Sequence, residues 1–203
     1  MSPLVTVLLV VLLVIVGALV IAAIWGVGIY NSLVALRNAC KNAFAQVDVQ
    51  LKRRYDLIPN LVETAKGYLA HESGTLTAVI EARAKATQAN VRLAGNPNDP
   101  AAMRDVLQAE SGLSGALGRL MVVSENYPQL KADTQMRALM EELTSTENRI
   151  AFARQAYNDS VLAYNNGRET FPQVLVANTF GFVPADFFKV ENEAERAAPS
   201  VKF

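Results

Sequence analysis

The chain of 203 residues has few of the side chains on which catalytic and metal sites depend. It contains one cysteine, Cys40, and one histidine, His71, so it can form no internal disulfide. These two side chains cannot supply the three protein ligands of a catalytic zinc site. The Glu-x-x-His motif of di-iron bundles is also missing, because Tyr68 stands three residues before His71. The sequence therefore predicts no catalytic residue, no cofactor and no metal ligand.

Neither sign of charge is in excess. Lys and Arg together number 19, Asp and Glu together number 19, and the formal net charge is zero. A nucleic-acid-binding surface needs a basic excess to replace counterions, so no nucleic-acid partner is expected. The charge is also unevenly distributed, because residues 1–36 contain no Asp, Glu, Lys or Arg. This distribution indicates a membrane segment joined to a polar domain.

The uncharged N-terminal stretch is almost wholly Leu, Val, Ile, Ala and Gly from Pro3 to Ile29. It is longer than the roughly 20 residues that a helix needs to cross the hydrocarbon core of a bilayer. A cleaved signal peptide is the alternative, but the run is too long for its apolar region and no basic residue precedes it. We therefore expect residues 1–29 to be a retained transmembrane anchor, with Trp25 and Tyr30 at the membrane interface.

The basic residues near this anchor lie on one side of it. Arg37 and Lys41 follow the span closely, whereas no Lys or Arg precedes it. By the positive-inside tendency, the chain crosses the membrane once, with its N-terminus outside and its large domain in the cytoplasm.

Beyond Tyr30 the apolar residues recur at spacings of three and four, which is typical of helices that bury one face. Cys40 lies on such a face and is expected to be a small core residue. Proline-containing breaks divide the sequence into predicted helices over residues 30–55, 59–93, 100–124 and 131–168, with an aromatic-rich tail over 169–203. Short connections make neighbouring helices antiparallel. The predicted fold is therefore all-α: an N-terminal transmembrane helix over residues 1–29, followed by an antiparallel up-down-up-down four-helix bundle over residues 30–168 with coiled-coil packing.

The break at Pro59 has an alternative, which is a kink in one continuous helix over residues 30–93. At the helical rise, such a helix would extend about 96 Å and would leave most of its apolar stripe without a partner of matching length. We therefore favour a helical hairpin at Pro59.

Several stretches of the chain resemble the LemA family. The longest is residues 46–62 (QVDVQLKRRYDLIPNLV), and the others are 30–37, 125–128, 146–151, Phe171-Pro172 and 180–182. These stretches follow one another along the chain in the same order as in the family. The resemblance implies a protein of the bacterial cytoplasmic membrane with one N-terminal span, an antiparallel helical bundle and no established enzymatic activity. The chain departs from the family at Gly112, Gly115 and Gly118, where larger helix formers are expected. Glycines spaced in this way let another helix approach closely, at a cost in helix propensity.

Charged side chains interrupt the apolar faces of the predicted helices, and buried charges need partners. Counting along the helices from the membrane end brings Arg83 level with Glu110 and Glu72 level with Arg149. We interpret these as two structural ion pairs that fix the helix register. A polar functional site inside the bundle is the alternative. The basic residues 52–54 are interpreted as complementing the carbonyl end of the first bundle helix.

The tail after the last predicted helix is rich in phenylalanine, with Phe171, Phe180, Phe182, Phe187 and Phe188. Two placements of this tail are open. In the first, it folds over the ends of the bundle or packs on a neighbouring subunit. In the second, it rests in the membrane interface, with Phe180 and Phe182 as a further contact with the lipid bilayer.

Three functional classes remain. The favoured class is a non-enzymatic, membrane-anchored helical scaffold that self-associates into a homo-oligomer and organises the membrane. The second is a membrane-tethered adaptor that recruits an unidentified cytoplasmic protein. The third is an enzyme, which the missing catalytic groups disfavour.

Overall fold

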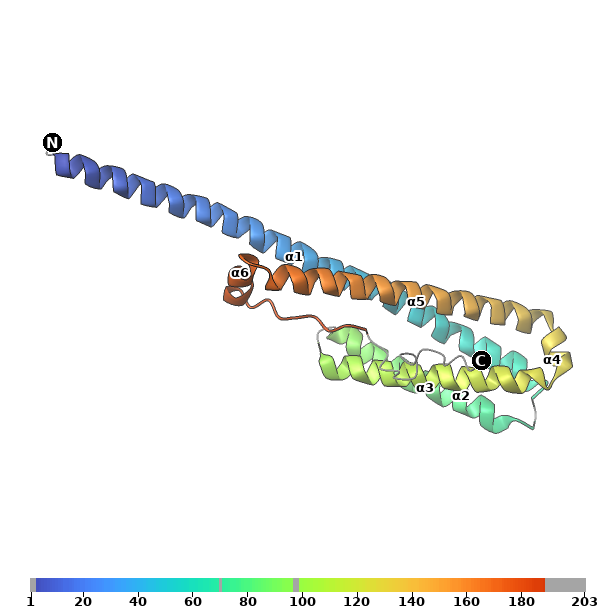
Figure 1. Cartoon of the computed structure of the whole chain (residues 1–203). Helices are drawn as coiled ribbons and strands as arrows, with labels where there is room; N and C mark the ends of the chain where they lie inside the picture. The colour runs from blue at the N-terminus through green and yellow to red at the C-terminus, as the bar shows by residue number, and fades with distance from the viewer. Residues whose placement is uncertain (1–2, 70, 97–98, 189–203) are drawn as a thin grey trace, which may run out of the picture. The chain divides into compact units, whose positions relative to one another are not determined.

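The computed structural model describes residues 3–69, 71–96 and 99–188 of the chain. These residues form six α-helices and no strand (Figure 1). The helices are α1 (Pro3–Lys66), α2 (Ser73–Gly95), α3 (Pro100–Glu125), α4 (Pro128–Ala132), α5 (Thr134–Glu169) and α6 (Gln173–Thr179). The prediction of an all-α chain with a long apolar N-terminal helix is confirmed.

The chain divides into two compact units, and each unit combines separate stretches of sequence. The first contains Met1–Cys40 and Ser160–Ala185, and the second contains Lys41–Asp159 and Asp186–Phe203. Helices α1 and α5 therefore contribute residues to both units.

The N-terminal part of α1 carries the uncharged apolar stretch. The most apolar stretch of α1 is not buried within the protein, so this part of α1 does not serve as a core helix of the chain. Its length and composition are sufficient to cross a membrane.

In the first unit α1 continues alongside α5. At Gly167 the two helices approach so closely that an added Cβ would lie 2.7 Å from Leu36 Cδ1. The Cys40 thiol donates to the Ser160 carbonyl at 3.1 Å, and its burial raises the pKa of the thiol. Cys40 is therefore a core residue, as expected.

The second unit has an apolar core to which α1, α2, α3 and α5 contribute. The buried residues lie four or seven apart on each helix, so each helix turns one face inward. They include Val47, Leu51 and Ile58 of α1, Val79, Ala86 and Leu93 of α2, Val106, Leu113 and Leu120 of α3, and Met136, Leu143 and Ile150 of α5. Within this unit α2 and α3 lie side by side (Figure 1).

Aspartates mark where two of these helices begin. Asp99 precedes α3, which starts with Pro100, and its Oδ1 accepts a hydrogen bond from the Ala101 N–H at 2.9 Å. Asp133 precedes α5, and its Oδ1 accepts from the Met136 N–H at 2.8 Å. This bond holds the pKa of the Asp133 carboxyl below its usual range.

The predicted hairpin at Pro59 is wrong. Pro59 lies inside α1, which continues to Lys66, and α2 begins only at Ser73. The alternative of one helix over residues 30–93 is also wrong, because helical structure stops between α1 and α2. The break therefore lies about two helical turns beyond Pro59.

A side chain from α2 explains why α1 tolerates this proline. Proline has no N–H to donate to the carbonyl four residues earlier, which here belongs to Tyr55. Arg83 Nε donates to the Tyr55 carbonyl oxygen at 2.6 Å instead. The carbonyl that Pro59 leaves without its helical donor is therefore satisfied, which reduces the penalty for continuing the helix.

We expect the cost of removing Arg83 to depend on Pro59. Arg83→Ala leaves the Tyr55 carbonyl without this donor and should lower the free energy of unfolding by about 1–3 kcal/mol. In a Pro59→Ala background the backbone regains an N–H at position 59, so the same substitution should cost less. Chemical unfolding followed by circular dichroism measures the four variants.

The control is Lys85→Ala, at an exposed position of α2, which should cost the same in both backgrounds. An equal cost of Arg83→Ala with and without Pro59 would contradict this explanation of the continuous helix.

Candidate membrane-contact site

An aromatic cluster in the first unit lies where the apolar part of α1 ends. The Tyr30 ring packs edge-on against Phe180 and Phe182, with ring centroids 5.0 and 5.5 Å apart. The Arg37 guanidinium lies 5.2 Å from the centre of the Phe182 ring. The structure thus brings together three of the four aromatic residues predicted for the membrane interface. Trp25, the fourth, is exposed on α1 five residues before Tyr30.

The turn after α6 leaves one ring of this cluster buried and another exposed. Gly181 adopts φ +69°, a conformation that favours glycine, and the Phe182 N–H donates to the Ala177 carbonyl at 2.9 Å. Phe182 is 6% exposed, whereas Phe180 is 62% exposed. This burial revises the role predicted for Phe182: its ring packs on protein, and Phe180 is left to face outward.

Further apolar side chains of the same segment are exposed. Phe171, Leu175 and Val183 accompany Phe180 on the surface of the first unit. Exposed apolar groups beside the end of a helix of membrane length are suited to contact with lipid. We refer to Phe171, Leu175, Phe180 and Val183 as the apolar face of the tail.

Part of the tail packs on the protein, as the first of the two predicted placements requires. In the second unit Phe188 is buried against Tyr157, with ring centroids 6.4 Å apart. The Arg154 guanidinium lies 4.7 Å from the centre of the Phe188 ring. The tail therefore combines buried rings with an exposed apolar face.

Side chains of α5 bind the backbone of the tail. In the first unit Asn165 Nδ2 donates to the Ala185 carbonyl at 2.9 Å, and its Oδ1 accepts from the Ala185 N–H at 3.0 Å. The Tyr164 hydroxyl donates to the Val183 carbonyl at 2.8 Å, and Arg168 Nε donates to the Phe182 carbonyl at 3.1 Å. These bonds hold the chain that carries the aromatic cluster.

The second unit repeats this arrangement with residues seven positions earlier on α5. The Tyr157 hydroxyl donates to the Asp186 carbonyl at 3.0 Å. Asn158 Nδ2 donates to the Phe188 carbonyl at 3.2 Å, and its Oδ1 accepts from the Phe188 N–H at 2.8 Å. Seven helical residues rise about 10.5 Å, close to the length of three extended residues, so the two Tyr-Asn pairs match tail positions three residues apart.

The centre of the second unit contains a cluster of charged side chains. Glu110 accepts hydrogen bonds from Arg54 Nη2, from the Tyr55 hydroxyl, and from Arg154 Nη2 at 3.3 Å. Arg54 Nη1 donates to Glu147 Oε1 at 2.7 Å. Arg54 and Glu110 are 1% and 3% exposed, so their charges are almost fully removed from water. We call Arg54, Tyr55, Glu110, Glu147 and Arg154 the buried charge cluster.

The cluster changes the proton affinities of its members. Burial by itself lowers the pKa of Arg54, but the carboxylates of Glu110 and Glu147 outweigh it and raise the pKa above its ordinary value. Burial and the neighbouring Glu110 carboxylate raise the pKa of the Tyr55 hydroxyl. Arg54 therefore stays cationic and Tyr55 stays a neutral hydrogen-bond donor.

Neither of the two predicted ion pairs forms. Glu110 is buried as predicted, but it binds Arg54 and Arg154 rather than Arg83, whose Nε binds the Tyr55 carbonyl. Glu72 is half-exposed at the N-cap of α2, and Arg149 is exposed on α5. Within the part of the chain that the structure describes, no ion pair joins these two residues.

The interpretation of the basic residues 52–54 is also wrong. They do not end a helix, because α1 continues to Lys66. Arg54 follows Leu51 by three residues and precedes Ile58 by four, so its spacing placed it on the buried face of α1. That spacing was the signal in the sequence. Only the fold shows that Glu110 and Glu147 reach it.

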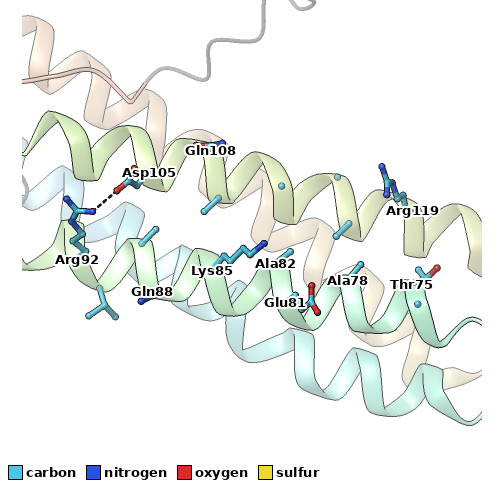
Figure 2. Close-up of a pocket in the computed structure, with 17 residues that line it drawn as sticks. Thr75, Ala78, Glu81, Ala82, Lys85, Gln88, Arg92, Asp105, Gln108 and Arg119 are labelled. Atoms are coloured by element: carbon cyan, nitrogen blue, oxygen red, sulfur yellow. Dashed lines mark hydrogen bonds and ion pairs between the residues drawn. The ribbon is translucent and has the colours of Figure 1, made fainter.

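An open groove of about 1220 Å³ runs between α2 and α3 in the second unit (Figure 2). Small and charged residues line much of it. The small ones are Gly74, Ala78, Ala82, Ala89, Ala109, Gly112, Gly115 and Ala116, and the charged ones are Glu81, Lys85, Arg92, Asp105 and Arg119. A Cβ added at Gly112 or Gly115 would meet no atom within 4 Å.

These features define a class of protein: an all-helical chain whose N-terminal helix is long and apolar enough to cross a membrane. The family is equally clear. The model of the LemA family matches residues 43–203, which is most of the sequence, so the chain belongs to the LemA family. The resemblance recognised in the sequence is confirmed.

Three individual relatives share about a quarter of their aligned residues with this chain. Magnetosome protein MamQ of Magnetospirillum gryphiswaldense is 26% identical over 177 residues, which cover 78% of this chain and 64% of the relative. Magnetosome protein MamQ 2 of Paramagnetospirillum magneticum is 26% identical over 178 residues, covering 79% and 64%. Protein LemA of Metamycoplasma hominis is 25% identical over 170 residues, covering 84% and 73%. The chain thus spans less than two thirds of the length of these MamQ relatives.

The raised pKa of Tyr55 predicts a stability difference that depends on pH. Where the unfolded chain loses the tyrosine proton, above about pH 10, the folded chain retains it. The contribution of Tyr55 is therefore complete below that pH and is lost as the pH rises beyond it, at up to about 1.4 kcal/mol per pH unit. At pH 7 chemical unfolding should give Tyr55→Phe a lower free energy of unfolding than the wild type. This difference in free energy should become smaller above pH 10. A difference that stays constant with pH would contradict the raised pKa of Tyr55.

The binding of the tail by Asn165 is testable by hydrogen exchange. Asn165→Ala removes two hydrogen bonds to Ala185 and should speed amide exchange over residues 182–185 by about tenfold or more. Asn166→Ala, at the exposed neighbouring position, is the matched control and should leave this exchange unchanged. Equal exchange in both variants would show that Asn165 does not hold the tail.

Proposed function

We propose that this protein is a non-enzymatic, membrane-anchored helical scaffold that self-associates and organises the membrane. Residues 1–29 cross the bacterial cytoplasmic membrane once, with the N-terminus outside and the helical domain in the cytoplasm. The observation that carries this proposal is the apolar face of the tail, of which Phe180 packs against Tyr30 at the end of the apolar stretch. Membership of the LemA family supports it.

The arrangement of the helical domain is part of the proposal. Contacts within the second unit support an up-down-up-down four-helix bundle of α1, α2, α3 and α5. Asn90 Nδ2 of α2 donates to Asp48 Oδ1 of α1 at 2.6 Å, Arg53 of α1 pairs with Glu142 of α5, and Glu110 links α3 to α1. Such a bundle presents long outer faces for association.

The apolar face of the tail is proposed to rest among the lipid headgroups, next to the end of the span. Each large apolar side chain that leaves water contributes about 1.5–3 kcal/mol. Phe171, Leu175, Phe180 and Val183 are each exposed in the first unit, so their insertion would remove four apolar side chains from water. The tail then forms a second contact between the protein and the bilayer.

A membrane-tethered adaptor is the second candidate function. The open groove between α2 and α3 favours it, because such a groove can accept a helix of another protein. The mass of the detergent-solubilised protein separates the two: the scaffold predicts a homo-oligomer, and a strictly monomeric particle would favour the adaptor.

Tryptophan fluorescence tests the membrane contact, because Trp25 is the single tryptophan of the sequence. Two variants are compared. The test variant combines Trp25→Phe with Phe180→Trp, and the control combines Trp25→Phe with Phe152→Trp. Lipids brominated near the headgroup should quench the tryptophan of the test variant severalfold more strongly than that of the control. Phe152 is 74% exposed and lies in the second unit, on α5. If the tryptophan at position 180 is quenched no more strongly than the one at position 152, the tail does not contact the membrane.

A further inference from the structure

The groove between α2 and α3 carries charges at matching levels of the two helices. Arg92 Nη1 and Asp105 Oδ2 lie 2.7 Å apart, so this pair marks one level of the antiparallel helices (Figure 2). Counting eleven residues back from Arg92 and eleven forward from Asp105 places Glu81 level with Ala116, one turn from Arg119. Glu81 and Arg119 are exposed, and neither forms an ion pair among the residues described.

Small residues lie between these two charged levels. By the same count, Ala82 of α2 is level with Gly115 of α3. Glycine weakens the interior of a helix relative to alanine, yet the described chain does not use the space that Gly115 leaves open. The open space and the unpaired charges therefore occur on one face.

We propose that this face is the self-association surface and that it docks on the same face of a second copy. The inference rests on the self-association proposed above and adds the surface that mediates it. A two-fold axis parallel to the helices places α2 of each copy over α3 of the other. Residues at the same level then meet, so Glu81 lies within reach of Arg119 of the second copy and Ala82 lies opposite its Gly115.

Charge complementarity identifies a second copy as the occupant. In this arrangement Arg92 also faces Asp105 of the second copy, and Lys85 faces its Gly112, so no like charges meet. The symmetry forms each ion pair twice. A rotation about an axis along the helices leaves their direction unchanged, so both copies can be anchored in one membrane.

Charge reversal at Glu81 and Arg119 tests the pairing in the full-length protein. Glu81→Arg places two positive charges opposite each other, and Arg119→Glu places two negative charges opposite each other. Each variant alone should raise the apparent dissociation constant about tenfold or more, measured by sedimentation in detergent. A mixture of the two variants restores opposite charges at both contacts, so differently tagged copies should co-purify with near wild-type affinity.

A steric pair of variants tests the close approach independently. Gly115→Leu fills the space opposite Ala82 of the second copy and should weaken association. Gly118→Leu also projects into open space but does not line the groove, so it is the matched control and should leave association unchanged. Circular dichroism checks that both variants keep the helical content of the wild type.

The outcomes separate this surface from the scaffold function. A wild-type protein that is monomeric overturns both. If the wild type is an oligomer and neither the charge reversals nor Gly115→Leu weakens its association, this surface is overturned and the scaffold function is not. Reversals that weaken association without recovery in the mixture overturn the pairing of Glu81 with Arg119.

Discussion

Arg54 and Tyr55, two adjacent residues of α1, connect the helices of the second unit. The Arg54 guanidinium binds Glu110 of α3 and Glu147 of α5, while Tyr55 binds Glu110 through its hydroxyl and Arg83 of α2 through its carbonyl. A charge removed from water costs several kcal/mol unless it is paired, so sliding one helix along another would break these bonds at high cost. The register of α2 against α3, and with it the pattern of charges along their groove, depends on this constraint.

The bond between Tyr55 and Arg83 also accounts for the length of α1. Pro59 would ordinarily end or kink a helix, because it withdraws the donor from the carbonyl of Tyr55. Arg83 supplies a donor from outside the helix, and it can do so only because α2 packs at that level. A local rule of backbone chemistry is therefore overridden by a neighbouring helix. Tyr55, which also binds Glu110 through its hydroxyl, thus joins α2 to the helices that the buried charge cluster connects.

The tail is held by a different kind of recognition. Asn158 and Asn165 each bind both the N–H and the carbonyl of one tail residue, and Tyr157 and Tyr164 bind a carbonyl two residues earlier. These bonds reach the backbone and do not specify the tail's side chains. The outward-facing side chains of the tail are therefore free to be apolar, as a proposed contact with lipid requires.

The sequence alone determined the features that depend on local pattern. The uncharged stretch before Arg37, the helical spacing of buried residues such as Leu51 and Leu143, and the family motif around residues 46–62 were all legible, because composition and periodicity act over a few turns of chain. Only the tertiary structure decided the features that join distant residues. Arg83 bridges to Tyr55, Arg54 to Glu110, and Asn165 to Ala185, across 28, 56 and 20 positions. No spacing rule encodes such pairs, because they depend on how helices are turned toward one another, and the packing of the whole unit sets that.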